Sequence, residues 1–326
     1  MSNPVRLVVV GAGSMGANHV RVARQTAGVS LVALVDPDLS RARSVAGGGD
    51  IEVVASINEL STPIDAAVIA VPTPQHVNVA TSLASRGVHL LVEKPLARTV
   101  ADAEAIVEAA RAAGIVLAVG HVERFNPVVT ELRGVLDSPI HFSATRVSPF
   151  TPRIGDGVVL DLMIHDIDIV CSLLDTGDEV VEVSGVSRTT RSQSEDLASV
   201  VMRFSSGITA AFNTSRIGQQ KVRLLEVTQS DSVVTADLLR QNITVNRMTS
   251  HEYLSNDGSP RYRQATVVET PILETRGEPL ANQLASFVSS IQSRTAPLVD
   301  GTAGLRAVAL AERITSGLQS PQSSIK

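Results

Sequence analysis

Residues 7–16 read Leu7-Val8-Val9-Val10-Gly11-Ala12-Gly13-Ser14-Met15-Gly16, and this stretch decides the fold of the first half of the chain. Four apolar residues predict a buried strand, and three glycines with the spacing G-x-G-x-x-G follow it directly. The first glycine permits a tight turn, the second lets the backbone approach a pyrophosphate, and the third lets a helix pack closely on the strand. The stretch therefore predicts a dinucleotide-binding fold in which the start of the helix receives the phosphates.

Asp36 ends the second predicted strand, twenty residues after Gly16. A carboxylate at this place accepts hydrogen bonds from ribose hydroxyls, and its charge repels a 2′-phosphate. We therefore expect NAD rather than NADP, although Arg41 and Arg43 lie nearby in the sequence and leave NADP open. The residues expected to bind the cofactor here are Gly11, Gly13, Ser14, Met15, Gly16, Asp36 and Arg41.

The first 120 residues alternate short β-branched runs with helical patterns, which is the rhythm of parallel βαβ units. The strands are continuous apolar runs, as expected where helices cover both faces of a sheet. We expect an α/β fold with a doubly wound parallel sheet. Its strands are predicted near 5–10, 31–35, 66–71, 88–92 and 115–119, and its helices near 14–27, 38–46, 76–86 and 99–113.

The pattern changes after residue 120. Asn126-Pro127 predicts a helix N-cap with proline in the first helical position, and a strand near 140–147 and a helix near 158–174 follow. Runs rich in Val, Ile and Thr then predict a large antiparallel sheet, with strands at 180–190, 197–204, 207–216, 221–229, 232–238 and 241–247. Two helices near 279–293 and 303–317 complete an α+β domain. The predicted domains are residues 1–120, an NAD-binding Rossmann domain, and residues 121–326, a domain for substrate binding and oligomerisation.

The bulk composition excludes several classes of partner. A length of 326 residues fits two domains. A net charge of −5 without a long basic run argues against nucleic acid, and no apolar run is long enough to span a membrane. The apolar run after Met1 is too short for a signal peptide, so we expect a cytoplasmic protein with a small-molecule partner. Too little sequence follows the antiparallel sheet to cover its outer face, so a homodimer or homotetramer is expected.

Two further segments follow predicted strands of the parallel sheet, at the edge where open α/β sheets bind ligands. They are Pro72-Thr73-Pro74-Gln75-His76 and Glu93-Lys94-Pro95. Lys94 is one of only three lysines among 28 basic residues, which favours a specific role for it. His76 could bind the cofactor or simply begin the next helix, and the sequence favours neither interpretation. The cofactor-binding candidates in and beside these segments are Val71, Thr73, His76, Glu93 and Lys94.

The helix predicted at 158–174 carries a narrow polar stripe on an apolar body. At 100° per residue, Asp161, His165, Asp168 and Ser172 fall at about 0°, 40°, −20° and 20° around its axis. A histidine one turn from a carboxylate can act as a general base, whereas an ordinary solvated stripe remains the structural alternative. A metal site would need further ligands, and this helix offers no second histidine and no cysteine partner, so no metal is expected.

The glycine fingerprint, Glu93-Lys94-Pro95 and Asp161-Leu162-Met163-Ile164-His165-Asp166 together resemble the glucose-fructose oxidoreductase and inositol dehydrogenase family, Gfo/Idh/MocA. The resemblance covers nearly the whole chain. It implies that Lys94 and His165 are catalytic with Asp161 as the third member, and that residues 71–76 lie along the cofactor. Residues 120–127 and Pro152-Arg153-Ile154 resemble the subgroup that contains UDP-N-acetylglucosamine 3-dehydrogenases.

On this basis we expect His165 to take the proton of a secondary sugar hydroxyl while Lys94 stabilises the developing alkoxide. The subgroup implies oxidation at C3 of UDP-N-acetylglucosamine to the 3-keto sugar nucleotide. An inositol or simple-sugar dehydrogenase, and a cofactor-sensing binding protein without catalysis, remain alternatives. Arg124 and Arg153 are candidates for binding the diphosphate. The full set of substrate-binding candidates is Lys94, His121, Arg124, Asn126, Arg153, Asp161 and His165.

Overall fold

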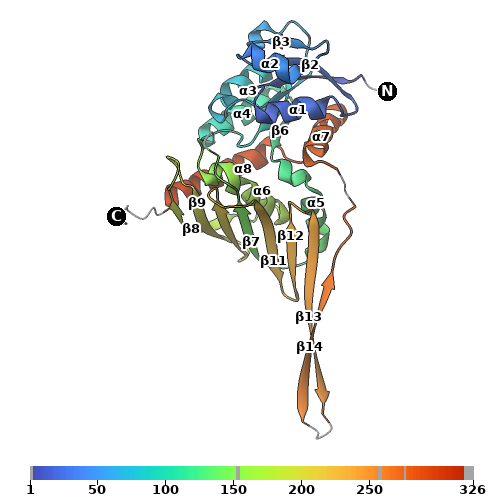
Figure 1. Ribbon diagram of the computed structural model, residues 1–326, viewed down its shortest axis with the longest axis vertical. Coiled ribbons are helices and arrows are strands. Elements are labelled where there is room, and N and C mark those ends of the chain that lie inside the picture. The colour runs from blue at the N-terminus through green and yellow to red at the C-terminus, as the bar shows by residue number, and fades with distance from the viewer. Residues whose placement is uncertain (1–2, 152–154, 256–258, 275–276, 319–326) are drawn as a thin grey trace. The chain divides into compact units, whose positions relative to one another are not determined.

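The computed structural model describes residues 3–151, 155–255, 259–274 and 277–318. The chain divides into two compact units, each with its own sheet (Figure 1). Unit 1 comprises residues 1–125 and 277–312, and unit 2 comprises residues 126–276 and 313–326. None of the described helices is both long and apolar enough to cross a membrane.

Unit 1 contains a six-stranded parallel sheet in the order β3-β2-β1-β4-β5-β6. The strands are β1 (Val5–Val10), β2 (Val29–Val35), β3 (Glu52–Val54), β4 (Ala66–Ile69), β5 (His89–Glu93) and β6 (Leu117–Gly120). The helices are α1 (Ser14–Ala23), α2 (Leu39–Ala46), α3 (His76–Ala84), α4 (Val100–Ala113), α7 (Pro279–Ser293) and the first part of α8 (Gly301–Gly317). This arrangement confirms the predicted doubly wound sheet.

Helices cover both faces of this sheet because alternate residues of its strands point in opposite directions. Leu7 and Val9 of β1 share one buried cluster with residues of α1 and α7, including Val20 and Phe287. Val8 and Val10 belong to a second cluster with residues of α3 and α4. Continuous apolar strands therefore indicated the layering correctly.

The observed division differs from the predicted boundary at residue 120. The chain leaves unit 1 after residue 125, and residues 277–312 return to it. The physical reason is that α7 buries Leu284 and Phe287 in the same cluster as Leu7. In addition, the Val119 N–H donates to the Val299 carbonyl at 3.0 Å, which ties β6 to the segment before α8.

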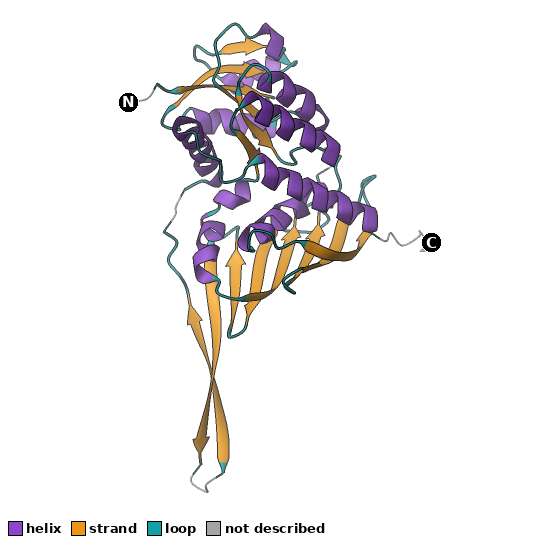
Figure 2. Cartoon of the chain, turned by 180° about the vertical axis from the view of Figure 1, so that it is seen from behind, coloured by secondary structure: helices purple, strands orange, loops and turns teal. Residues whose placement is uncertain are grey.

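Unit 2 contains an eight-stranded sheet in the order β14-β13-β12-β11-β7-β10-β9-β8. The strands are β7 (Pro139–Val147), β8 (Val180–Arg188), β9 (Leu197–Phe204), β10 (Thr209–Ser215), β11 (Val222–Gln229), β12 (Ser232–Asp237), β13 (Asn242–Leu254) and β14 (Pro260–Glu269). The helices are α5 (Pro127–Val135) and α6 (Ile164–Leu173), which lie against one face of the sheet (Figure 2). The large antiparallel sheet is confirmed, with one exception: β7 and β10 are parallel neighbours.

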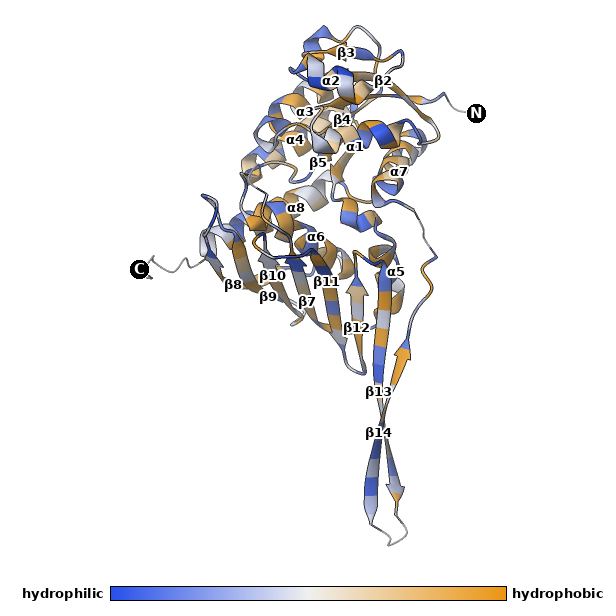
Figure 3. Ribbon diagram, viewed as in Figure 1, coloured by the Kyte–Doolittle hydropathy of each residue, from blue (hydrophilic) through white to orange (hydrophobic). Residues whose placement is uncertain are grey.

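Two features of unit 2 differ from the predicted elements. β13 continues past residue 247 to Leu254, and β14 was not predicted at all. Every residue of β14 is exposed, so this strand has no buried face to impose an alternating apolar pattern. Figure 3 shows mixed polar and apolar colours along this pair of strands.

Candidate functional site

The glycine loop between β1 and α1 has the shape that its sequence predicts. Gly11 has a positive φ of 102°, and a Cβ there would lie 2.5 Å from the Ala70 carbonyl oxygen. A Cβ at Gly16 would lie 1.8 Å from the carbonyl oxygen of Gly11. Among the described residues, nothing lies within 4 Å of a Cβ built on Gly13. The first and third glycines are therefore required by the fold, and the second leaves open space beside the loop.

The first turn of α1 fits a phosphate group. Gly13 is its N-cap and supplies no side-chain hydrogen bond, while Ser14 and Met15 are exposed. The first backbone N–H groups of a helix lack intrahelical acceptors, and the helix dipole places partial positive charge beside them. These donors next to the open space at Gly13 match the pyrophosphate of a dinucleotide.

Asp36 at the end of β2 is buried and strongly hydrogen-bonded. Its Oδ2 accepts from the Ala12 N–H at 2.7 Å, and its Oδ1 accepts from the Asp38 N–H at 2.8 Å and from Arg41 Nη2 at 2.7 Å. Burial alone would raise the pKa of Asp36, but these donors outweigh it and hold the pKa below its ordinary value. A carboxylate has about four acceptor positions, so one remains on Oδ2 for a ribose hydroxyl.

His76 is buried between the loop that follows β4 and the loop that follows β5. Its Nδ1 lies 3.0 Å from the Pro95 carbonyl and 3.2 Å from the Leu96 carbonyl, and its Nε2 lies 3.0 Å from the Val71 carbonyl. Burial lowers the pKa of His76, and the three carbonyl contacts oppose this only in part. The imidazole therefore joins the loop after β4 to the loop after β5. Thr73 on the first of these loops is half-buried.

Glu93, at the end of β5, is tied to α1 by a histidine that the sequence analysis did not single out. His19 Nε2 lies 2.7 Å from Glu93 Oε1, and both residues are buried. Burial alone would raise the pKa of Glu93, but the contact with His19 and the charge and N–H of Lys94 lower it below its ordinary value. A Cβ at Gly120 would lie 2.7 Å from the Glu93 Cα and 2.8 Å from the Glu93 carboxylate oxygen Oε2. A side chain at residue 120 would therefore displace Glu93.

Lys94 follows this anchored carboxylate and is half-buried. Its N–H donates to Glu93 Oε2 at 3.2 Å. His19 on α1, which begins at the glycine loop, therefore fixes the residue that precedes Lys94. The signal in the sequence was a lone histidine on the apolar face of the first helix.

In unit 2, residues 158–173 form one continuous helix that begins irregularly. Residues Val159–Met163 form a π-helical turn, and the α-helix α6 continues from Ile164. The wheel with 100° per residue therefore does not hold across residues 159–163, because a π turn bonds i to i+5. π turns are frequent at functional sites.

The predicted polar stripe divides into two parts. Asp161 and His165 are half-buried, whereas Asp168 and Ser172 are buried. The Ser172 hydroxyl donates to the Ile169 carbonyl at 2.6 Å, which occupies it within the helix. Asp161 and His165 are thus the accessible members of the stripe, at and just after the π turn.

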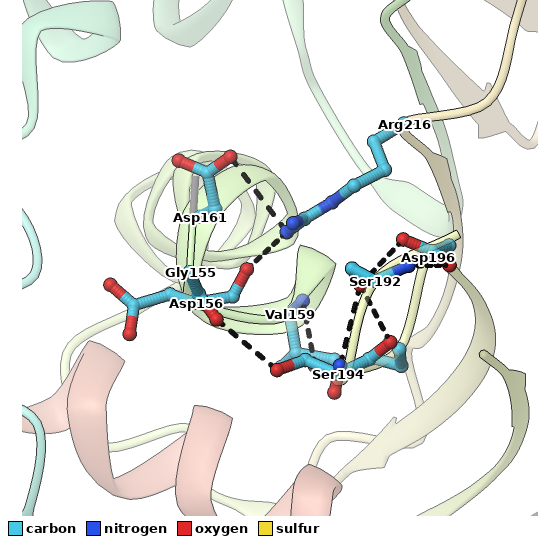
Figure 4. A network of polar contacts seen from close by, with 9 residues as sticks. Gly155, Asp156, Val159, Asp161, Ser192, Ser194, Asp196 and Arg216 are labelled. Carbon is cyan, nitrogen blue, oxygen red and sulfur yellow. Dashed lines mark hydrogen bonds and ion pairs between the residues drawn. The ribbon is translucent and has the colours of Figure 1, made fainter. Parts of the chain in front are cut away.

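Asp161 faces a buried arginine that the sequence analysis also missed (Figure 4). Arg216 follows β10, its side chain is 3% exposed, and its Nη2 lies 4.0 Å from Asp161 Oδ2. The same nitrogen donates to the Asp156 carbonyl. Arg216 therefore holds positive charge beside Asp161 and connects it to the chain before the π turn. The only signal in the sequence was an arginine at the end of the strand predicted at 207–216.

A tight loop at residues 190–196 supports this arrangement (Figure 4). Asp196 accepts the N–H groups of Thr190 and Arg191 at 2.7 and 2.6 Å and the Ser192 hydroxyl at 2.7 Å. Burial alone would raise the pKa of Asp196, but these donors lower it far below its ordinary value. The Glu195 carbonyl accepts the Val158 N–H at 3.0 Å. The loop thus holds the start of the helix.

Beneath the same helix lies a buried ion pair. Arg146 of β7 donates to both oxygens of Asp166 at 2.9 and 2.7 Å, and the two side chains are 1% and 9% exposed. Asp166 is the neighbour of His165 and points to the sheet. A two-pronged contact of this kind fixes the rotation of the helix about its axis.

The other substrate candidates have varied surroundings. His121 is buried and Arg124 is half-buried in unit 1. Asn126 is a confirmed N-cap: its Oδ1 accepts the Val128 N–H at 3.2 Å, while its Nδ2 donates to the Leu238 carbonyl at 3.0 Å. Arg153 lies outside the described residues. Lys94 belongs to unit 1, whereas Asp161 and His165 belong to unit 2.

In the part of the chain that the structure describes, no group of three or more His, Cys, Asp or Glu side chains could hold a metal ion. The groups that could bind a cofactor or take part in a reaction are the phosphate-binding loop with Asp36, the half-buried Lys94, and the pair Asp161 and His165.

Comparison with known proteins agrees with this arrangement. Residues 5–121 match a family model described as an oxidoreductase family with an NAD-binding Rossmann fold. Residues 129–232 match the model of the GFO/IDH/MocA C-terminal domain. The first model matches most of the N-terminal part of unit 1, and the second matches part of unit 2.

Individual relatives match this chain over most of its length. The chain is 31% identical over 313 residues to UDP-N-acetylglucosamine 3-dehydrogenase of Acidithiobacillus ferrooxidans, covering 95% of this chain and 96% of that one. It is 28% identical over 267 residues to scyllo-inositol 2-dehydrogenase (NAD(+)) of Bacillus subtilis, covering 75% and 78%. A solved structure of the Acidithiobacillus enzyme superposes with a TM-score of 0.84 at 28% identity, covering 98% of each chain. The chain therefore belongs to the Gfo/Idh/MocA family of oxidoreductases, with an NAD-binding Rossmann domain in its first part.

Proposed function

We propose that the protein is an NAD-dependent dehydrogenase that oxidises a secondary hydroxyl of a sugar. The observation that carries the proposal is the half-buried pair Asp161 and His165 at a π turn, with the buried Arg216 guanidinium 4.0 Å from the Asp161 carboxylate. These two polar side chains are half-buried on a largely apolar helix, where a ligand can reach them.

Each residue has a distinct role in this reaction. Neutral His165 accepts the proton of the hydroxyl as general base. Lys94 donates a hydrogen bond to the same oxygen and stabilises its developing negative charge. Asp161, itself held by Arg216, orients the side chain or the substrate hydroxyl that it meets. The alcohol loses one proton and one hydride and becomes a ketone.

The cofactor would be held by residues of unit 1. The first turn of α1 would receive the pyrophosphate, and the remaining acceptor position of Asp36 would receive a ribose hydroxyl. Bound NAD supplies the hydride acceptor. His76, Val71 and Glu93 fix the backbone of the neighbouring loops, and Glu93 anchors Lys94 through its N–H.

The substrate that we favour is UDP-N-acetylglucosamine, oxidised at C3 to the 3-keto sugar nucleotide. Full-length similarity to a UDP-N-acetylglucosamine 3-dehydrogenase supports it. A sugar nucleotide also needs cations for its diphosphate, and Arg124 and Arg153 are the candidates. Inositol dehydrogenases are relatives as well, so an inositol is the second candidate substrate.

The test is cofactor reduction by the purified protein with three substrates: UDP-N-acetylglucosamine, myo-inositol and glucose. We expect turnover with the first, and NAD to bind at least tenfold more tightly than NADP, a difference of about 1.4 kcal/mol. Deuterium placed at C3 of the sugar should appear in the reduced nicotinamide. A preference for myo-inositol would identify an inositol as the substrate. NAD binding without turnover of any of the three would favour a cofactor-sensing protein.

A further inference from the structure

Two buried histidines contact the chain on either side of Lys94. His19 of α1 contacts the side chain of Glu93, the residue before Lys94. His76, the first residue of α3, contacts the backbone carbonyls of the two residues after it. The side chain of His19 is 0% exposed and His76 is 1% exposed, whereas Lys94 is half-buried. All of these residues belong to unit 1. The accessible lysine therefore stands between two inaccessible contacts.

The contact before Lys94 orients a buried carboxylate. His19 Nε2 lies 2.7 Å from Glu93 Oε1, and Glu93 Oε2 accepts the Lys94 N–H at 3.2 Å. The side chain of Glu93 is 8% exposed. A buried carboxylate is costly unless donors satisfy it, so the donor at His19 Nε2 keeps Glu93 in place. With one oxygen held by His19, the other oxygen is aimed at the Lys94 N–H.

The contact after Lys94 uses the other ring nitrogen. His76 Nδ1 lies 3.0 Å from the Pro95 carbonyl and 3.2 Å from the Leu96 carbonyl, and Nε2 lies 3.0 Å from the Val71 carbonyl. Carbonyl oxygens only accept hydrogen bonds, and a neutral imidazole carries one N–H. Two acceptors meet at Nδ1 and one at Nε2, so the proton belongs on Nδ1. His76 then donates to the segment that follows Lys94.

A lysine that acts on a reacting oxygen needs a fixed backbone, because its ammonium sits on a long, flexible stem. A displacement of about 1 Å in a catalytic group can cost roughly 10² in rate. The helix α1 that carries His19 also carries the first turn that fits a pyrophosphate, five residues earlier at Ser14. The same helix therefore presents donors to the cofactor and holds the segment that contains Lys94.

We propose that His19 and His76 are positioning residues for Lys94: one imidazole holds the backbone before it and the other holds the backbone after it. We call the pair His19 and His76 the histidine clamp. The proposal rests on the role of Lys94 in the proposed sugar dehydrogenase reaction. Neither histidine touches the substrate, and each acts on the reaction through the place of the lysine ammonium.

Glutamine and asparagine substitutions test the clamp, because each amide replaces a different ring nitrogen. The amide nitrogen of glutamine is as many bonds from Cα as Nε2 of histidine, and that of asparagine as many as Nδ1. His19→Gln and His76→Asn therefore keep the donor toward the Lys94 segment and should leave kcat within threefold of the wild type. His19→Asn and His76→Gln lose that donor and should lower kcat at least tenfold. Steady-state kinetics with the preferred sugar measure kcat.

The dissociation constant of NAD should change less than threefold in all four variants, because none of them alters the phosphate-binding turn or Asp36. Calorimetry with NAD measures it. The opposite ranking of the two amides at the two positions is the signature of the clamp. A role in packing alone would rank asparagine and glutamine the same way at both positions, or would lower kcat in all four variants alike.

His89 provides the matched control, because it is a half-buried histidine at the other end of the same strand, β5. Its Nδ1 accepts the Val116 N–H at 2.9 Å, far along the strand from Lys94. His89→Asn and His89→Gln should each leave kcat within twofold of the wild type, whatever they do to the melting temperature.

The amide of Lys94 gives a second readout that needs no substrate. The chain has only three lysines, Lys94, Lys221 and Lys326, so protein labelled with 15N-lysine gives three backbone amide signals, and Lys94→Arg identifies the one from Lys94. The Lys94 amide proton should exchange with solvent at least tenfold faster in His19→Asn than in the wild type or in His19→Gln. The signal of exposed Lys221 should keep its position in all three proteins.

The proposal is overturned if the two amides rank the same way at both histidines, or if His19→Asn leaves the exchange of the Lys94 amide as in the wild type. If the wild type oxidises none of the sugars, the proposed function fails by itself. The exchange of the Lys94 amide then still decides whether His19 holds the lysine segment.

Discussion

Partial burial separates the three candidate catalytic residues from two other polar candidates that hold the fold. Lys94, Asp161 and His165 are half-buried, whereas His76 and Asn126 are buried and hydrogen-bond to backbone groups. A side chain whose donors and acceptors are already satisfied gains little from a ligand. The accessible trio is therefore the better candidate for chemistry.

We predict that His165→Ala and Lys94→Ala each lower kcat by roughly 10² or more, because each group acts on charge that develops in the transition state. NAD affinity and melting temperature should change little. Lys94→Arg should also lower kcat, since the guanidinium group is too broad to act as a point charge on the substrate oxygen. Steady-state kinetics with NAD titrations measure both effects.

Ser172→Ala is the control, because it alters the same helix at a buried hydroxyl that bonds only within the helix. It should leave kcat within a fewfold. If His165→Ala instead shifts the melting temperature and leaves kcat within a fewfold, the histidine is part of the core.

At the residue scale, the sequence predicted the groups that stand in motifs and missed those that support them. The glycines and Asp36 were identifiable because their spacing follows from phosphate and ribose geometry. His19, Arg146 and Arg216 act through contacts with residues distant in the sequence, so no local pattern marks them.

At the scale of elements, the helix at 158–173 shows where periodicity stops being informative. The apolar run that predicted it is compatible with α and π turns alike. Its start is fixed by the Glu195 carbonyl and its rotation by the Arg146 and Asp166 pair. β14 escaped prediction for the opposite reason, since an exposed ribbon leaves no apolar alternation.

We predict that Arg146→Met destabilises the protein by about 3–5 kcal/mol, because it leaves the Asp166 carboxylate buried without its cation. The double variant Arg146→Met with Asp166→Leu should recover most of this loss, since two apolar groups replace both charges. Urea denaturation measures the free energies of unfolding. A single variant within 1 kcal/mol of the wild type would show that the pair does not hold the helix.

At the scale of the whole molecule, carboxylates with depressed pKa values are spread over both units. Hydrogen bonds from Ser61 and Thr62 lower the pKa of Glu52 to about 2. Glu93 in unit 1 and Asp178 in unit 2 are also lowered, because hydrogen-bond donors outweigh their burial. Two histidines shift the same way for a different reason: burial lowers the pKa of His76 and His89 below 6.5.

All these lowered pKa values make the folded protein less stable as the pH falls. For the histidines, the unfolded chain takes up protons below pH 6.5 that the folded chain refuses, so stability declines as the pH falls from there. For the carboxylates, the stabilisation is complete above their unfolded values of 3.8 to 4.5 and is lost as the pH falls toward the folded values. The free energy of unfolding should therefore be level above pH 7, decline gently to pH 5 and fall steeply below it.

Glu52→Gln isolates one part of this curve, because Glu52 is the carboxylate that accepts from Ser61 and Thr62. The variant should be less stable than the wild type at pH 7. The difference should shrink as the pH falls from 4.5 toward 2, since the wild-type carboxyl becomes protonated and loses the same interactions. Urea denaturation at pH values from 8 to 3 measures both proteins. A difference that stays constant over the acid range would mean that the charge of Glu52 does not contribute, and stability that rises on acidification would contradict the sign for the whole molecule.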